Sequence, residues 1–83
     1  MQTYLEKRQP AKNVARFYRM AVMPNLFGEW TLYREWGRIG QGSQVRMDWF
    51  AAENQAVAAL VTLEASKRQR GYWVEPQQLA MFR

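Results

Sequence analysis

The sequence predicts an α+β fold, a small antiparallel sheet of four or five strands with one α-helix packed across it. Two observations lead to this expectation. Up to about residue 50, apolar and polar side chains alternate with the period of β-strands, and segments rich in Gly, Pro or Asn interrupt the alternation. From residue 51 the apolar residues recur with the period of an α-helix. We therefore expect one domain over 1–83, with its core at about 14–74.

The first two predicted strands meet at a proline turn. Residues 3–8 alternate weakly and end before Pro10, so we expect an edge strand followed by a polar turn at Lys12 and Asn13. Residues 16–23 have a firmer strand pattern. Alternation gives this strand two partly apolar faces, one with Tyr18, Met20 and Val22 and the other with Phe17, Ala21 and Met23.

Two hairpins bring the next strands into the sheet. Residues 24–28, with the sequence Pro-Asn-Leu-Phe-Gly, have the chemistry of a turn before a long strand over 29–39. Residues 40–43, with the sequence Gly-Gln-Gly-Ser, turn the chain again into a strand over 45–50. We expect that strand to be half-buried, because Val45, Met47 and Trp49 alternate with Arg46 and Asp48.

A helix is expected from Ala51 to about Arg70. Glu53 near its start and basic residues near its end suit the helix dipole, and Gly71 is typical of the residue just after a helix. The stripe that would lie on the sheet consists of Ala52, Ala56, Ala59, Leu60 and Leu63. Residues 72–74 are expected to add a last short strand, and 75–83 to form a tail or a short helical turn.

The charge of the chain points to a polyanionic partner. Twelve basic residues stand against seven acidic ones, which gives a formal charge of +5. Nine of the basic residues are arginines, whose planar fork bonds phosphate bidentately and stacks on aromatic faces. A small basic protein that binds no particular ligand has the same composition, so charge alone leaves the partner open.

The most informative segment is the sequence Trp-Gly-Arg-Ile-Gly at 36–40. An indole packs on a base or a sugar while an adjacent guanidinium holds the neighbouring phosphate, and base stacking of this kind contributes ~1–3 kcal/mol. In an extended strand over 29–39, alternation creates a face that changes from apolar residues to an Arg-Trp-Arg cluster. That face carries Trp30, Leu32, Arg34, Trp36 and Arg38.

Taken in order, these segments resemble a WGR domain, the module named for its Trp-Gly-Arg motif. It is found in DNA-dependent poly(ADP-ribose) polymerases and in many bacterial proteins, some described as molybdate-metabolism regulators. The resemblance covers about residues 14–74. It rests on the Phe17-Tyr18 strand, the strand into Trp36-Gly37-Arg38-Ile39-Gly40, the turn Gln41-Gly42-Ser43, the strand at Val45, the alanine-rich helix with its basic end, and Gly71-Tyr72-Trp73.

The resemblance implies an antiparallel sheet crossed by a helix, and a module that helps to recognise DNA ends. In the polymerases the motif tryptophan packs on a terminal sugar, and the motif arginine contacts the backbone and relays contact to neighbouring domains. These roles would fall on Trp36 and Arg38, with Gly37 allowing close backbone approach. Because the resemblance ends near Val74, we expect no ADP-ribosyl transfer chemistry in this chain and no internal partner for a relay.

Further candidate binding residues also have a plain structural interpretation. Arg34 shares the predicted face with Trp36 and Arg38. Trp36 is equally consistent with a core aromatic residue that Arg38 caps through a cation–π contact. A helix end near this face would add the charges of Lys67, Arg68 and Arg70. That basic run is also typical of a solvated helix end favoured by the dipole.

The sequence offers no support for catalysis, a metal or a cofactor. It contains neither cysteine nor histidine, so thiol nucleophiles and the usual zinc ligand sets are absent. Ser43 and Ser66 have no histidine base, and Glu29 and Glu35 lie too far apart on a strand to share a proton. The glycines of 37–42 lack the spacing and the lysine of a phosphate-binding loop. We therefore expect a protein that is not an enzyme.

The principal hypothesis is a cytoplasmic, monomeric module that binds nucleic acid, DNA rather than RNA, at sugar-phosphate or at ends without strict sequence specificity. Backbone readout is favoured because the helix has an alanine-rich face and a basic end in place of base-reading side chains. The alternative is an adaptor that docks an acidic or aromatic protein on the same Arg-Trp-Arg face. No secretory signal and no window of ~18 apolar residues is present, so no membrane is expected.

Overall fold

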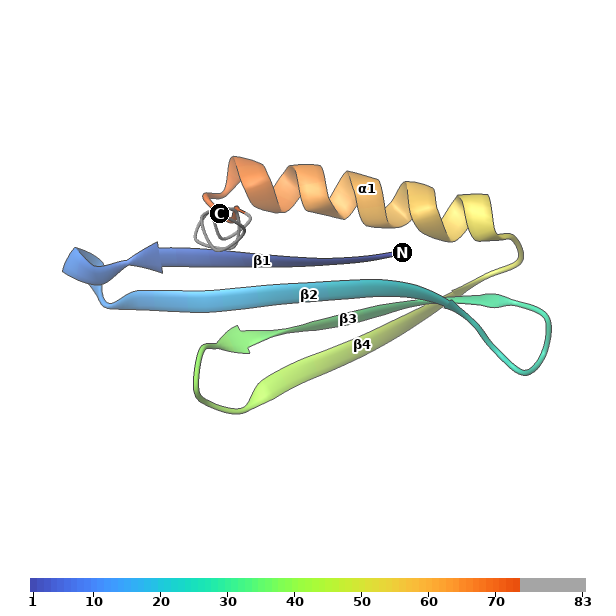
Figure 1. Ribbon diagram of the computed structural model, residues 1–83, viewed down its shortest axis with the longest axis horizontal. Helices are drawn as coiled ribbons and strands as arrows, with labels where there is room; N and C mark the ends of the chain where they lie inside the picture. Colours follow the sequence, from blue (N-terminus) through green and yellow to red (C-terminus); the bar gives the residue numbers. More distant parts are fainter. Residues whose placement is uncertain (74–83) are drawn as a thin grey trace, which may run out of the picture.

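A computed structural model describes residues 1–73 of the chain as a four-stranded antiparallel sheet and one helix. Figure 1 shows α1 running along one side of the sheet. The predicted α+β fold is therefore confirmed. The elements in order are β1 (Gln2–Gln9), a 3-10 turn η1 (Pro10–Lys12), β2 (Val14–Pro24), β3 (Trp30–Arg38), β4 (Ser43–Phe50) and α1 (Glu53–Gln69).

The sheet is a meander in which each strand pairs antiparallel with the next, in the order β1-β2-β3-β4. Tyr18 of β2 lies between Leu5 of β1 and Trp36 of β3. Since directly opposed residues share a face, this register defines the side of the sheet that α1 covers. On β3 that side carries the five residues expected from alternation, Trp30, Leu32, Arg34, Trp36 and Arg38.

The core lies between α1 and the covered face of the sheet. Ala56 and Leu60 of α1 have no exposed surface, and Ala59 and Leu63 pack around them, so most of the predicted helix stripe is confirmed. Full burial of a Leu or Met side chain stabilises the fold by roughly 1.5–3 kcal/mol. The other buried apolar residues are Leu5, Tyr18, Met20, Val22 and Leu32.

The turns form where their chemistry predicts them. Asn13 adopts a left-handed conformation (φ 55°) and its N–H donates to the carbonyl of Pro10. In the β2–β3 turn the side-chain oxygen of Asn25 accepts hydrogen bonds from the backbone N–H groups of Phe27 (2.9 Å) and Glu29 (3.0 Å). This Asx arrangement gives the hairpin a defined shape without burying its tip.

Strand β4 is more exposed than its alternation suggests. Its apolar residues Val45, Met47 and Trp49 lie on the face of the sheet that α1 does not cover, and they are 48–63% exposed. The covered face of β4 instead receives Arg46 and Asp48. Alternation separates the two faces of a strand, but the hairpin register decides which of them turns toward the helix.

Within the described residues, the segment after α1 contributes an isolated bridge to the sheet. Trp73 makes an isolated antiparallel bridge with Glu6, with N–H···O distances of 3.0 and 2.9 Å, in place of the expected short strand over 72–74. Val74 and the tail expected at 75–83 lie outside the described residues. Within 1–73, the structure contains no helix with the length and apolar character needed to cross a membrane.

Replacing Leu60 with Ala tests the packing of α1 on the sheet. We expect the free energy of unfolding to fall by about 2–5 kcal/mol, because a fully buried side chain leaves a cavity that the sheet cannot fill. Val61→Ala on the neighbouring, half-exposed position is the matched control, with an expected change within about 1 kcal/mol. Urea unfolding followed by tryptophan fluorescence measures both. Equal losses would show that α1 does not pack through Leu60.

The raised pKa of the Tyr4 hydroxyl leads us to expect a loss of stability at alkaline pH. Burial and a 2.7 Å hydrogen bond to Glu6 raise its pKa to about 12, from 10.0 in the unfolded chain. Protonated Tyr4 therefore contributes stability that is complete below pH 10 and is lost between pH 10 and about 12. We expect Tyr4→Phe to flatten this part of the stability curve, measured by urea unfolding at a series of pH values. Parallel curves for the two proteins would contradict the assignment.

Candidate nucleic-acid interface

A cavity of about 360 Å³ opens at the end of the sheet where the β3–β4 turn lies. Its walls come from β2, β3, the β3–β4 turn, the start of β4 and the segment after α1. The lining residues are Arg16, Trp36, Gly37, Arg38, Gly42, Gln44 and Tyr72. All three residues of the Trp-Gly-Arg motif therefore belong to one concave surface.

Trp36 belongs to both the core and the cavity. Its ring stacks on Tyr18, directly opposite on β2, with ring centroids 5.6 Å apart and planes inclined by 13°. The guanidinium of Arg34 lies over the same indole, 5.7 Å from the centroid. The cation on Trp36 is thus Arg34, where the sequence alone suggested Arg38. Stacking holds the indole at a fixed angle while it lines the cavity.

Arg38 ties β3 to the β1–β2 turn. Its Nη1 donates to the backbone carbonyl of Asn13 and its Nη2 to the side-chain oxygen of the same residue, each at 2.9 Å. The N–H of Ile39 adds a hydrogen bond to the carbonyl of Ala15. A guanidinium has five N–H donors, so this anchoring orients Arg38 and still leaves it donors for a ligand.

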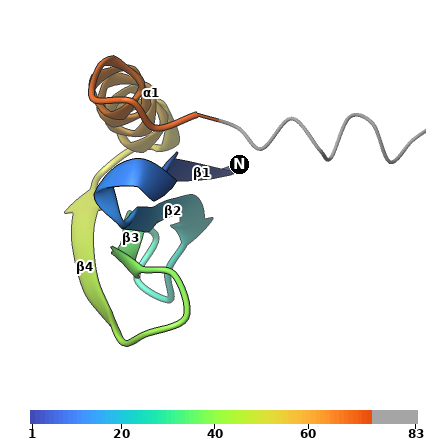
Figure 2. The ribbon, with the colours of Figure 1, turned by 90° about the vertical axis from the view of Figure 1, so that its left-hand side faces the viewer.

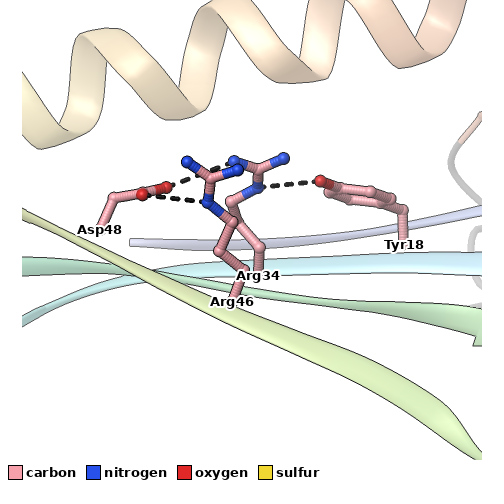
Figure 3. Close-up of polar contacts among 4 residues, drawn as sticks. All are labelled: Tyr18, Arg34, Arg46 and Asp48. Atoms are coloured by element: carbon pink, nitrogen blue, oxygen red, sulfur yellow. Dashed lines mark hydrogen bonds and ion pairs between the residues drawn. The ribbon is translucent and has the colours of Figure 1, made fainter.

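Arg34 is held beneath α1 and does not line the cavity. Figure 3 shows its Nε donating to the Tyr18 hydroxyl (3.0 Å) and its Nη1 to Asp48 (3.2 Å), which also binds Arg46. Burial lowers the pKa of Arg34, but the hydrogen bonds and charge of Tyr18 and Asp48 outweigh burial and raise it. The predicted Arg-Trp-Arg cluster shares one face, but its arginines are held by different partners.

Gly37 lies where the chain folds back on itself. A Cβ at this position would be 2.9 Å from the carbonyl oxygen of Gly42 and 3.1 Å from the Cα of Ser43. The close backbone approach expected here is therefore made by the chain's own β3–β4 turn. Glycine at 37 allows that turn to fold against the strand beside Trp36.

A Schellman motif at the end of α1 brings Tyr72 to the cavity. Gly71 has φ 96°, and its N–H donates to the carbonyl oxygen of Arg68 (3.1 Å). The N–H of Tyr72 donates to the carbonyl oxygen of Lys67 (3.0 Å). The predicted glycine after the helix is confirmed. The reversal packs the Tyr72 ring edge-on against Tyr18, with centroids 6.3 Å apart.

The basic helix end lies beside these aromatic rings, although none of its three predicted residues lines the cavity. The Nζ of Lys67 is 4.5 Å from the centroid of Tyr18 and 5.9 Å from that of Tyr72. Burial lowers the pKa of Lys67, and the neighbouring charges of Arg70 and Arg34 lower it further. Arg68 pairs with Glu64 one turn earlier (2.9 Å). The structure thus brings Lys67 close to the motif, and Arg68 is engaged on the helix surface.

Sequence reasoning missed Arg16, Gln44 and Tyr72 as lining residues. Arg16 is exposed, lies directly opposite Arg38 in the β2–β3 register, and its side chain makes no hydrogen bond or ion pair with any residue of 1–73. Counting back two positions from Tyr18 would have placed Arg16 on the same face as the motif. No alternation signal links Tyr72 to that face, because the helix separates it from the sheet in sequence.

Comparison with known proteins gives two findings. The sequence model of a protein family described as WGR domain matches residues 1–78. A protein of Sinorhizobium fredii described as uncharacterized protein y4dW is 44% identical over 73 residues, which are 88% of this chain and 36% of that protein. The chain thus spans about a third of the length of this curated relative. No solved structure matches the chain.

Replacing Gly37 with Ala tests the steric fit of the β3–β4 turn. We expect the free energy of unfolding to fall by about 1–3 kcal/mol, because the new methyl group meets backbone atoms that cannot rotate away. Gly42→Ala is the matched control, since a Cβ there meets no atom within 4 Å. Chemical unfolding of both variants checks this difference. If Gly37→Ala is as stable as Gly42→Ala, the turn does not pack against β3 as described.

Proposed function

The chain belongs to the WGR domain family, a family of non-catalytic modules known for binding nucleic acid, and on this premise we propose that it binds DNA. The ligand is exposed sugar-phosphate, above all at duplex ends, and binding is without strict sequence specificity. The protein itself is not an enzyme. Trp36 packs on a sugar or base, and Arg38 and Arg16 hold the adjoining phosphate.

The observation that carries the proposal is the pair of arginines facing each other across β2 and β3. Arg16 and Arg38 are register partners on the same face, and like charges directly opposite each other destabilise a sheet. No carboxylate from the described residues lines the cavity to relieve that repulsion. A bound phosphate relieves it, beside an indole that supplies the stacking surface.

The positive charges around the cavity favour contact with the DNA backbone over contact with the bases. Lys67 sits over the rings of Tyr18 and Tyr72, and Arg70 is exposed at the same helix end. Both add positive charge near the cavity, which attracts phosphate whatever the base sequence. Among the described residues that line the cavity, Gln44 alone has an amide side chain. Arg34 contributes indirectly, because it holds the Tyr18 ring on which Trp36 stacks.

Arg16→Ala is the sharpest test of the phosphate site, since this side chain makes no hydrogen bond or ion pair with any residue of 1–73 that its removal would break. We expect DNA affinity to fall about threefold to tenfold. For the unmodified protein the slope of log affinity against log salt is expected to lie at roughly −2 to −4, and the variant is expected to have a slope smaller in magnitude by about 0.9. The matched control is Arg19→Ala, which removes the same charge from the same strand on the opposite face. Fluorescence anisotropy with a labelled duplex measures both. Equal losses would indicate non-specific attraction to net charge.

End recognition is tested by comparing a 5′-phosphorylated open duplex with the same sequence closed at both ends. We expect tighter binding to the open duplex and loss of the difference in Trp36→Ala, with circular dichroism to verify that the variant is folded. An RNA duplex of the same sequence tests the preference for DNA. Equal affinity for open and closed DNA would remove end recognition from the proposal.

The second candidate function is a protein adaptor that docks an acidic or aromatic partner at the same cavity. An arginine pair beside an indole suits a carboxylate as well as a phosphate. This candidate predicts no measurable affinity for either duplex at low salt. It also predicts saturable binding to one protein partner that is weakened by Arg16→Ala.

A further inference from the structure

The outer edge of β4 is open. β4 is the last strand of the sheet, and no described residue pairs with its outer side. In Figure 2 it forms the margin of the sheet on the side away from β1. The opposite edge is partly closed, because Glu6 of β1 exchanges two hydrogen bonds with Trp73.

This edge lacks most of the features that usually prevent strand pairing. Natural proteins protect an exposed edge with a very short strand, with Lys or Pro, with a bulge, or with charged side chains that point inward. β4 has two charged side chains on its helix-facing side, Arg46 and Asp48, but they are of opposite sign and pair with each other. β4 is eight residues long and contains neither Lys nor Pro. Its register with β3 is continuous from Ser43 to Phe50, so no bulge interrupts it. The strand is therefore long and regular enough to pair with another strand.

The sequence of β4 is complementary to itself when the strand is reversed. In a two-fold antiparallel pair centred on Met47, that residue faces its own copy and Val45 faces Trp49. In the same register Arg46 faces Asp48, and the symmetry repeats this pair of opposite charges. Opposite charges and apolar pairs directly across two strands both stabilise a sheet.

We propose that β4 pairs antiparallel with β4 of a second copy of this chain, which joins the two sheets into one. On the face that α1 leaves uncovered, the half-exposed Val45, Met47 and Trp49 cover the same residues of the other copy. On the face that α1 covers, Arg46 (side chain 62% exposed) reaches Asp48 of the second copy. This dimer replaces the monomer expected from sequence, and it does not depend on nucleic-acid binding.

Charge complementarity selects a second copy over an unrelated strand. Within one chain, Arg46 already reaches Asp48 at 3.1 Å, so both side chains lie at the same part of the edge. Asp48 also binds Arg34 at 3.2 Å, which keeps its carboxylate oriented on the helix-facing side. The open edge therefore presents a positive and a negative group two residues apart, and the reversed edge presents them in matching order.

Sedimentation velocity of the chain from about 10 µM to about 1 mM tests the proposal. We expect a monomer–dimer equilibrium that Arg46→Asp and Asp48→Arg each weaken about 10- to 100-fold, because each places two pairs of like charges across the interface. An equimolar mixture of the two variants is expected to form a heterodimer, since opposite charges then face each other again. Lys12→Asp, an exposed site with the same change in charge, is the control and leaves dimerisation unchanged.

Met47→Lys is a second test of the proposed interface. It is needed because Asp48→Arg also removes the ion-pair partner of Arg34 within the chain. Met47 is half-exposed, and its replacement places two ammonium groups opposite each other at the two-fold axis. We expect loss of the dimer and retention of the circular dichroism spectrum. A chain that stays monomeric at about 1 mM overturns the proposal and leaves the edge to an extended segment of another protein. A dimer that both Arg46→Asp and Met47→Lys leave intact also overturns it, because the interface then lies elsewhere.

Discussion

The structure depends on the buried ring of Tyr18. Its register position on β2 stacks it on Trp36, its hydroxyl accepts a hydrogen bond from Arg34, and Tyr72 packs against its edge. Lys67 lies over the same ring. One side chain thus links the second strand, the motif strand, the helix end and the segment beyond the helix, and the cavity takes its shape from this convergence.

The polar side chains around Tyr18 are satisfied by hydrogen bonds and ion pairs with one another and not by contact with solvent. Arg34 is largely covered, yet it contacts a hydroxyl, a carboxylate and an indole face. No buried side-chain nitrogen or oxygen of the described residues lacks a hydrogen-bond partner, as a stable core requires. Removing one member of such a network leaves the others desolvated and unpaired, so the network favours a single arrangement of the motif strand.

The site divides into a part that local sequence predicts and a part that it does not. Alternation along β3 was sufficient to place Trp36 and Arg38 on one face, and turn chemistry located the hairpins on either side. Arg16 and Tyr72 join them through the β2–β3 register and the reversal after Gly71. These are contacts between segments distant in sequence, and no local pattern encodes their pairing.

Local patterns along the chain were enough to establish the kinds of element, their order and the faces of each strand, because backbone periodicity is a local property. The ordered motif and helix also identified the family, and the match over residues 1–78 confirmed it. No local pattern predicts that β4 turns its apolar face away from the helix or that Arg34 is held by Tyr18 and Asp48. The reason is that hairpin register and helix placement select the buried face, and both depend on packing across the whole sheet.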